Sequence, residues 1–168
     1  MTISLYAISV PIFIRHLKGL AIVTRKAQAL YAEKKLDEAT LLGYRLYPDM
    51  FSFTRQVHMA TDHPITCASL LAGVDAPKHE GNEKSLAELI ARIEKTIAFL
   101  EGIKPAQIDG TEGKDVVVKG RDREMPFKGL ELLQNRVLPN FYFHCTTAYD
   151  ILRHNGLEIG KRHFMGND

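Results

Sequence analysis

LPNFYFHCTTAYDILRHNG, residues 138–156, is the stretch that decides the fold, because its apolar side chains recur at helical spacing around a histidine. At about 100° per residue, Phe141, His144 and Ile151 point within roughly 40° of one direction. Gly156 then supplies a residue that easily adopts the left-handed conformation with which many helices end. We therefore expect a helix in which His144 faces the core of a helical protein.

Three further segments show apolar residues at helical spacing and predict long helices. Asp49 is expected to cap the second of them and Gly73 to end it, and Pro64 near its middle is expected to kink it. Ser85 caps the third, where Glu88 completes a capping box. The three segments cover residues 2–32, 50–71 and 86–102.

Prolines and short breaks define the remaining helical elements. Pro11 is expected either to start the regular part of the first helix or to kink it. Asp37 is placed to cap a short helix over residues 38–42. The last helix is predicted over residues 128–154, with Pro139 as an interruption.

Two short strands are predicted between the third and the last helix. Residues 115–119 and 123–127 flank a Gly-Arg-Asp turn and predict a small β-hairpin, with Pro126 confining the second strand to an edge. Residues 74–84 contain a proline and a glycine and predict a surface loop. Four long amphipathic helices with short breaks predict an all-α four-helix bundle, formed as a single domain by residues 1–168.

Composition excludes several classes of protein. Hydrophobic residues at 45% and charged residues at 25% are ordinary for a soluble globular chain. A net charge of +2, from 22 basic and 20 acidic residues without a basic stripe, predicts no nucleic-acid partner. No apolar run is long enough for a membrane span, and the N-terminal stretch lacks the early positive charge of a signal peptide. We therefore expect a cytoplasmic protein whose Cys67 and Cys145 are free, buried thiols.

Four stretches of the chain resemble the DinB/YfiT-like helical-bundle superfamily, and more narrowly a bacterial branch known only as a domain of unknown function. The resemblance implies an up-down-down-up bundle with a long crossover connection, in which we expect the small hairpin, and it implies a homodimer. The stretches are RLYPDMFSFTRQV (45–57), RIEKTIAFLEG (92–102), PNFYFHCTTAYDILRHNG (139–156) and IGKRHF (159–164).

The resemblance also bears on metal binding. Many members of the superfamily hold a divalent metal on three histidines, one from the second helix and two, spaced H-x-x-x-H, from the last. Several resemble thiol-dependent transferases that act on small electrophiles. Here His144 matches the first histidine of the pair, but Ala148 stands at the second position. This departure argues against a catalytic metal such as Zn or Ni.

Other residues offer few ligands with which to rebuild a metal site. His58 and Asp62 are i, i+4 neighbours, a spacing that can serve one ion. They lie about 100° and 140° from the apolar centre at Val57, so we expect them at the flank or the solvent side of their helix. His154 is ten positions from His144, roughly 15 Å along the axis, and cannot share an ion with it.

The remaining candidates are pocket residues rather than catalytic ones. His144 is either a neutral core histidine satisfied by hydrogen bonds or a ligand or general base in a pocket. His16 faces inward and Tyr149 borders a neighbouring helix, and both are further pocket candidates. The sequence contains no phosphate loop, C-x-x-C motif or nucleophile elbow. We therefore expect a small-molecule binding or interaction protein without a catalytic metal; the alternative is a divergent metal-dependent transferase with a rebuilt ligand set.

Overall fold

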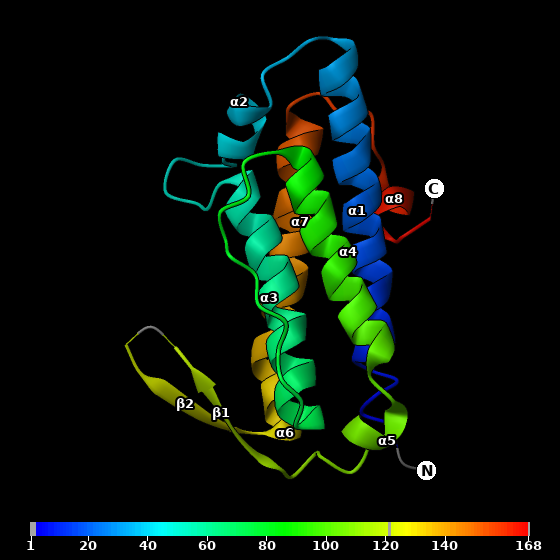
Figure 1. Ribbon diagram of the computed structural model, residues 1–168, viewed down its shortest axis with the longest axis vertical. Coiled ribbons are helices and arrows are strands. Elements are labelled where there is room, and N and C mark those ends of the chain that lie inside the picture. The colour runs from blue at the N-terminus through cyan, green and yellow to red at the C-terminus, as the bar shows by residue number, and fades with distance from the viewer. Residues whose placement is uncertain (1–2, 121, 168) are drawn as a thin grey trace.

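Four long helices form an elongated bundle in a computed structural model, which describes residues 3–120 and 122–167 (Figure 1). Two of them run in one direction and the two between them in the other, which gives the predicted up-down-down-up order. The first packs along the third and the second along the fourth. The helices are α1 (Val10–Glu33), α3 (Phe53–Ala72), α4 (Leu86–Gly102) and α7 (Leu138–His154).

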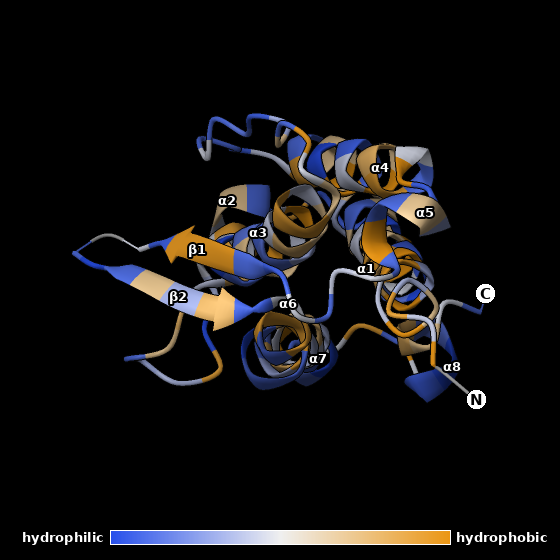
Figure 2. Cartoon of the chain, turned by 90° about the horizontal axis from the view of Figure 1, so that it is seen from below, coloured by the Kyte–Doolittle hydropathy of each residue, from blue (hydrophilic) through white to orange (hydrophobic). Residues whose placement is uncertain are grey.

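Apolar faces hold the bundle together. Phe13 of α1 and Phe141 of α7 are fully buried and meet edge-on, with ring centroids 5.1 Å apart. In the end-on view of Figure 2, the hydrophobic residues of α7 lie on the side that faces the other helices. Both cysteines, Cys67 and Cys145, are free and buried, as predicted. None of the described helices is long and apolar enough to cross a membrane.

A segment of residues 74–85, here called the crossover, connects α3 to α4 and runs along the bundle beside α3 (Figure 1). The predicted hairpin forms from β1 (Asp115–Lys119) and β2 (Glu124–Lys128), which pair antiparallel. It projects from one end of the bundle and follows the short helix α5 (Pro105–Ile108), so it lies in the connection from α4 to α7 and not in the crossover.

Local chemistry explains where two of the helices begin. α1 starts at Val10 and not at residue 2, which lies outside the described residues. Pro11 occupies the first turn of α1, where its missing N–H breaks no helical hydrogen bond. α3 starts after Ser52 and not after Asp49, because the Ser52 hydroxyl accepts a hydrogen bond from the Arg55 amide. The short helix α2 (Glu38–Gly43) begins at the predicted cap, Asp37.

The last helix was predicted to be interrupted at Pro139, but the chain takes a different path into α7. One turn of helix, α6 (Gly129–Glu131), leads into a π-helix, η1 (Leu132–Val137), and then directly into α7. Pro139 therefore lies in the first turn of α7. The wider π turns relieve the clash that its ring would make with a carbonyl one α-helical turn earlier.

The C-terminal segment packs closely against α1 because Gly19 has no side chain. The short helix α8 (Lys161–Phe164) packs there, and a Cβ at Gly19 would lie 2.6 Å from the Phe164 carbonyl oxygen. By contrast, a Cβ at Gly43, at the end of α2, would meet no heavy atom within 4 Å.

We expect Gly19→Ala to lower the free energy of unfolding by about 1–3 kcal/mol, because the new methyl group overpacks against backbone that cannot rotate away. Gly43→Ala is the matched control and should be neutral or stabilising by up to about 1 kcal/mol. Urea unfolding of both variants measures the difference. Equal effects would show that the C-terminal segment does not pack on α1 in solution.

Candidate functional site

His144 is buried between α7 and α3, as the sequence predicted, and its proton can be assigned. Its Nδ1 atom lies 2.7 Å from Oε1 of the buried Gln56. The Gln56 amide nitrogen donates to the Phe51 carbonyl, so Oε1 is the atom that faces the imidazole. Nδ1 therefore carries the hydrogen, and Nε2 is left as an acceptor without a partner in the described part of the chain.

Aromatic rings surround the His144 imidazole. The Phe51 ring stacks on it at 6.2 Å with an interplanar angle of 16°, and the His63 ring at 5.7 Å and 11°. Phe143 meets it edge-on at 5.3 Å. Phe51 is 45% exposed and Phe143 53%. The four residues, here called the His144 surface, place a buried acceptor beside two exposed aromatic rings.

Both histidines of the His144 surface are neutral at physiological pH. Burial, reinforced by the nearby Arg55 charge, lowers the pKa of His144 to about 4. Burial also lowers the pKa of His63 to about 4, with smaller contributions from His144 and Arg136. His63 lies within the predicted helix but was not singled out as a site residue, because its contact with His144 depends on the packing of α3 on α7.

The donor set around His144 does not fit the three-histidine metal site of the superfamily. Ala148, at the position of the second histidine, is fully buried and offers no ligand atom. The Nδ1 atom of His144 is engaged by Gln56. Within residues 3–120 and 122–167, no group of three or more His, Cys, Asp or Glu side chains is arranged to hold an ion.

His16 and Tyr149, the other predicted pocket residues, lie apart from the His144 surface. They line a narrow cavity with Cys145 and Phe164 that has no room for a water molecule. Nδ1 of His16 is buried without a hydrogen-bond partner, and burial lowers the pKa of this histidine. The three pocket candidates therefore do not form one site.

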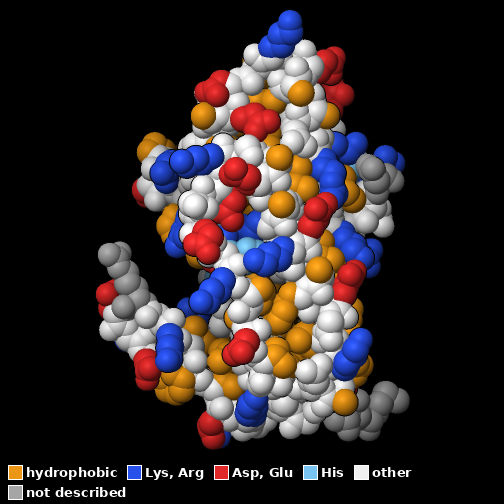
Figure 3. All heavy atoms as spheres, viewed as in Figure 1, with side chains coloured by type: hydrophobic (Ala, Val, Ile, Leu, Met, Phe, Trp, Pro, Cys, Tyr) orange, Lys and Arg blue, Asp and Glu red, His pale blue; other side chains and the backbone are white. Residues whose placement is uncertain are grey.

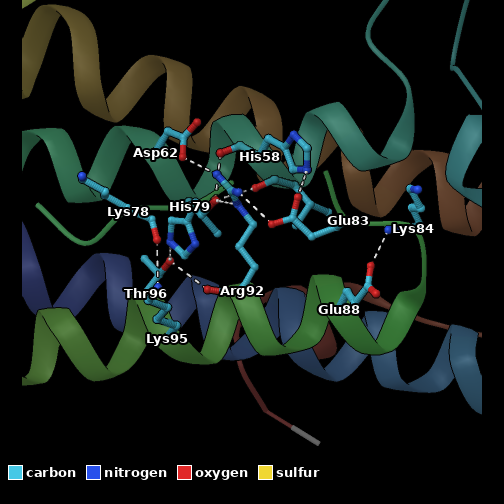
Figure 4. Close-up of polar contacts among 12 residues, drawn as sticks. His58, Asp62, Lys78, His79, Glu83, Lys84, Glu88, Arg92, Lys95 and Thr96 are labelled. Carbon is cyan, nitrogen blue, oxygen red and sulfur yellow. Dashed lines mark hydrogen bonds and ion pairs between the residues drawn. The ribbon is translucent and has the colours of Figure 1, made fainter. Parts of the chain in front are cut away.

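A second group of polar residues surrounds Arg92, whose side chain is only 3% exposed. Figure 4 shows it extending from α4 toward α3 and the crossover. Its Nε donates to the Thr61 hydroxyl at 2.7 Å, and Nη1 to Oε1 of Glu83 at 2.9 Å. Nη2 forms an ion pair with Asp62. The guanidinium thus joins two helices and the connection between them.

His58 belongs to the same group and is buried, contrary to its predicted place at the flank or solvent side of α3. Its Nε2 lies 2.8 Å from Oε2 of Glu83 without hydrogen-bond alignment. The crossover covers this side of α3, which the spacing within one helix could not reveal. Asp62 does lie toward solvent, with 41% of its side chain exposed.

Charges in this group are fixed by their neighbours. Burial alone would raise the pKa of Glu83, but the hydrogen bond and charge of Arg92 outweigh it and hold that pKa below its usual value. Burial, followed by the Arg92 charge, lowers the pKa of His58. Glu83 is therefore ionised and His58 neutral at pH 7.

Fold and site together define a DinB-like helical bundle in which the usual metal ligands are incomplete. The chain belongs to the family described as "Domain of unknown function (DUF1993)", whose model matches residues 5–165. It is similar to the crystal structure of a DinB family member protein from Shewanella denitrificans, with 37% sequence identity and a TM-score of 0.84. That match covers 98% of this chain and 93% of the other. No curated protein matches the sequence.

Stability should fall as the pH drops from about 6.5 toward about 4. In this range the unfolded chain binds protons at His63 and His144 that the folded chain resists, so acid favours unfolding. For His144 the loss should be on the order of 3 kcal/mol. Urea unfolding between pH 4 and 7.5 measures it, and His144→Leu should flatten the curve. An unchanged slope in that variant would contradict the assignment.

Proposed function

We propose that the protein binds a small molecule at the His144 surface and needs no catalytic metal to do so. The observation that supports this is the unused Nε2 acceptor of His144 beside exposed Phe51 and Phe143. A suitable ligand carries an N–H or O–H group that donates to Nε2 and a flat apolar part that packs on the rings.

The alternative, a metal-dependent transferase with a rebuilt ligand set, has less support from the donor atoms. Catalytic zinc sites use three protein ligands and leave one position open. His144 and His63 are the only two imidazoles brought together at the His144 surface among the described residues, and their rings are nearly parallel. Gln56 already holds one nitrogen of the pair.

The expected homodimer is a second proposal for the same part of the molecule. The aromatic run at residues 141–143 cannot fit entirely into one core: Phe141 is buried, whereas Phe143 is exposed. Further exposed apolar side chains precede α3 in the chain. They are Leu46, Tyr47 and Phe51.

Indole and phenol are suitable probes, since each has one donor group on a flat ring. We expect both to shift the NMR signals of Phe51, His144 and Phe143 in the full chain. His144→Leu should weaken binding by about tenfold or more, because the buried acceptor is lost. His154→Leu, near the exposed end of the same helix, is the matched control and should bind like the unchanged chain.

Two results would contradict the proposal. One is a set of probe-induced shifts that His144→Leu leaves unchanged. The other is binding, or thermal stability, that EDTA removes at neutral pH, which would restore the metal-dependent alternative. Light scattering on the same samples tests the homodimer: a monomer at tens of micromolar, where weak dimers still form, would exclude it.

A further inference from the structure

A polar groove lies on a different side of α3 from the His144 surface. His58 is about 200° around the helix from Gln56, which contacts His144. The groove has a volume of about 500 Å³ and lies between α3, the crossover and Arg92 of α4. Its charged and histidine lining residues are Arg55, His58, Asp62, His79, Glu80 and Arg92, and Thr66 adds a hydroxyl.

The proton on His79, which the crossover contributes, can be assigned from its neighbours. Its Nε2 lies 3.2 Å from the Thr96 hydroxyl oxygen. That hydroxyl donates its own hydrogen to the Arg92 carbonyl, so it must accept from His79. Nε2 of His79 therefore carries the hydrogen. Nδ1 is an acceptor with no partner in the part of the chain that the structure describes.

The proton on His58 can be assigned in a similar way. Nε2 of His58 lies 2.8 Å from the negatively charged carboxylate of Glu83, and this charge favours the tautomer with the hydrogen on Nε2 even though the two groups are not aligned for a hydrogen bond. Nδ1 of His58 is then a second acceptor without a partner among the described residues. Because His58 is 4% exposed, this acceptor is held in place by the packing around it.

The side chains that line the groove carry equal numbers of opposite charges. The guanidinium groups of Arg55 and Arg92 are accompanied by the carboxylates of Asp62 and Glu80. Glu83, which also pairs with Arg92, lies outside this lining. Figure 3 shows a histidine on this face with basic and acidic side chains around it. A groove lined by equal numbers of positive and negative side chains, with donors and acceptors side by side, favours a ligand whose groups can both donate and accept.

We propose that this groove binds a small, uncharged, hydroxyl-rich molecule of the sugar or polyol class. Each ligand hydroxyl can donate to Nδ1 of His58, Nδ1 of His79 or the Asp62 carboxylate, and can accept from Arg55. The volume is in the range of small-molecule sites. The groove shares no lining residue with the His144 surface, and this proposal does not rest on the aromatic ligand proposed there.

Glucose, ribose and myo-inositol are suitable probes, added to the full isotopically labelled chain. NMR shifts are the readout, because polyols raise the melting temperature of most proteins without binding them. We expect shifts of the imidazole nitrogens of His58 and His79 and of the backbone in residues 74–85. At least one probe should saturate these shifts in the millimolar range, as expected for a few hydrogen bonds in an open groove.

His58→Gln and His79→Gln are designed to keep the fold. A glutamine amide can retain the donor toward Glu83 or Thr96 but removes the ring acceptor at Nδ1. Each change should weaken probe binding by about tenfold. The control, His154→Gln, alters an exposed histidine at the end of α7 and should leave binding unchanged.

Three outcomes would overturn the proposal. The first is that none of the probes shifts the signals of the His58 and His79 nitrogens in the unaltered chain. This test does not depend on whether a variant folds. The second is that both glutamine variants bind as well as the unaltered chain. The third is that His144→Leu abolishes probe binding and the groove variants do not. If indole and phenol fail to bind at the His144 surface, this inference is unaffected, because it concerns a different site.

Discussion

A buried positive charge is the constraint on which the arrangement of the second half of the bundle depends. A guanidinium with so little exposure is stable only if carboxylates accompany it, because an unpaired charge in the interior costs several kcal/mol. Arg92 meets this requirement with Asp62 from α3 and Glu83 from the crossover. One side chain thereby ties α4 to α3 and fixes the long connection that lets both helices run in the same direction.

The position of the crossover then determines what lies on each side of α3. The crossover buries His58, which would otherwise face solvent, and brings His79 to Thr96. The other side of α3 packs on α7, where Gln56 holds the proton on one nitrogen of His144. Arg55 lies between the two regions, with its guanidinium 5.6 Å from the Phe51 ring centroid and at the edge of the groove. Two distinct recognition surfaces therefore share one helix.

Sequence periodicity predicted the features that depend on a single helix. The apolar stripes gave the four long helices, and the inward direction of His144 followed from its spacing to Phe141 and Ile151. Caps formed by one residue and its near neighbours, such as Asp37 and Gly73, were also predictable.

Features that depend on contacts between distant segments were not predictable. The burial of His58 requires the crossover to cover it, and no pattern within α3 indicates this. Glu83 lies in a stretch that resembles an ordinary loop, and its role appears only beside Arg92. The start of α3 was misplaced because Asp49 and Ser52 are equally good capping residues by type, and the fold decides between them. The π-helix before Pro139 likewise had no sequence signal of its own.

Limited trypsin digestion tests most directly whether the Arg92 group holds the crossover in place. Lys78 and Lys84 are exposed cleavage sites within the crossover. Glu83→Gln removes the charge that faces Arg92, and Glu80→Gln removes an exposed charge from the same segment. Mass spectrometry measures the rate of cleavage after Lys78 and Lys84. We predict that this rate becomes about tenfold higher in Glu83→Gln, because the loss of a buried ion pair favours local opening of the crossover. Equal cleavage rates in the two variants would contradict the account.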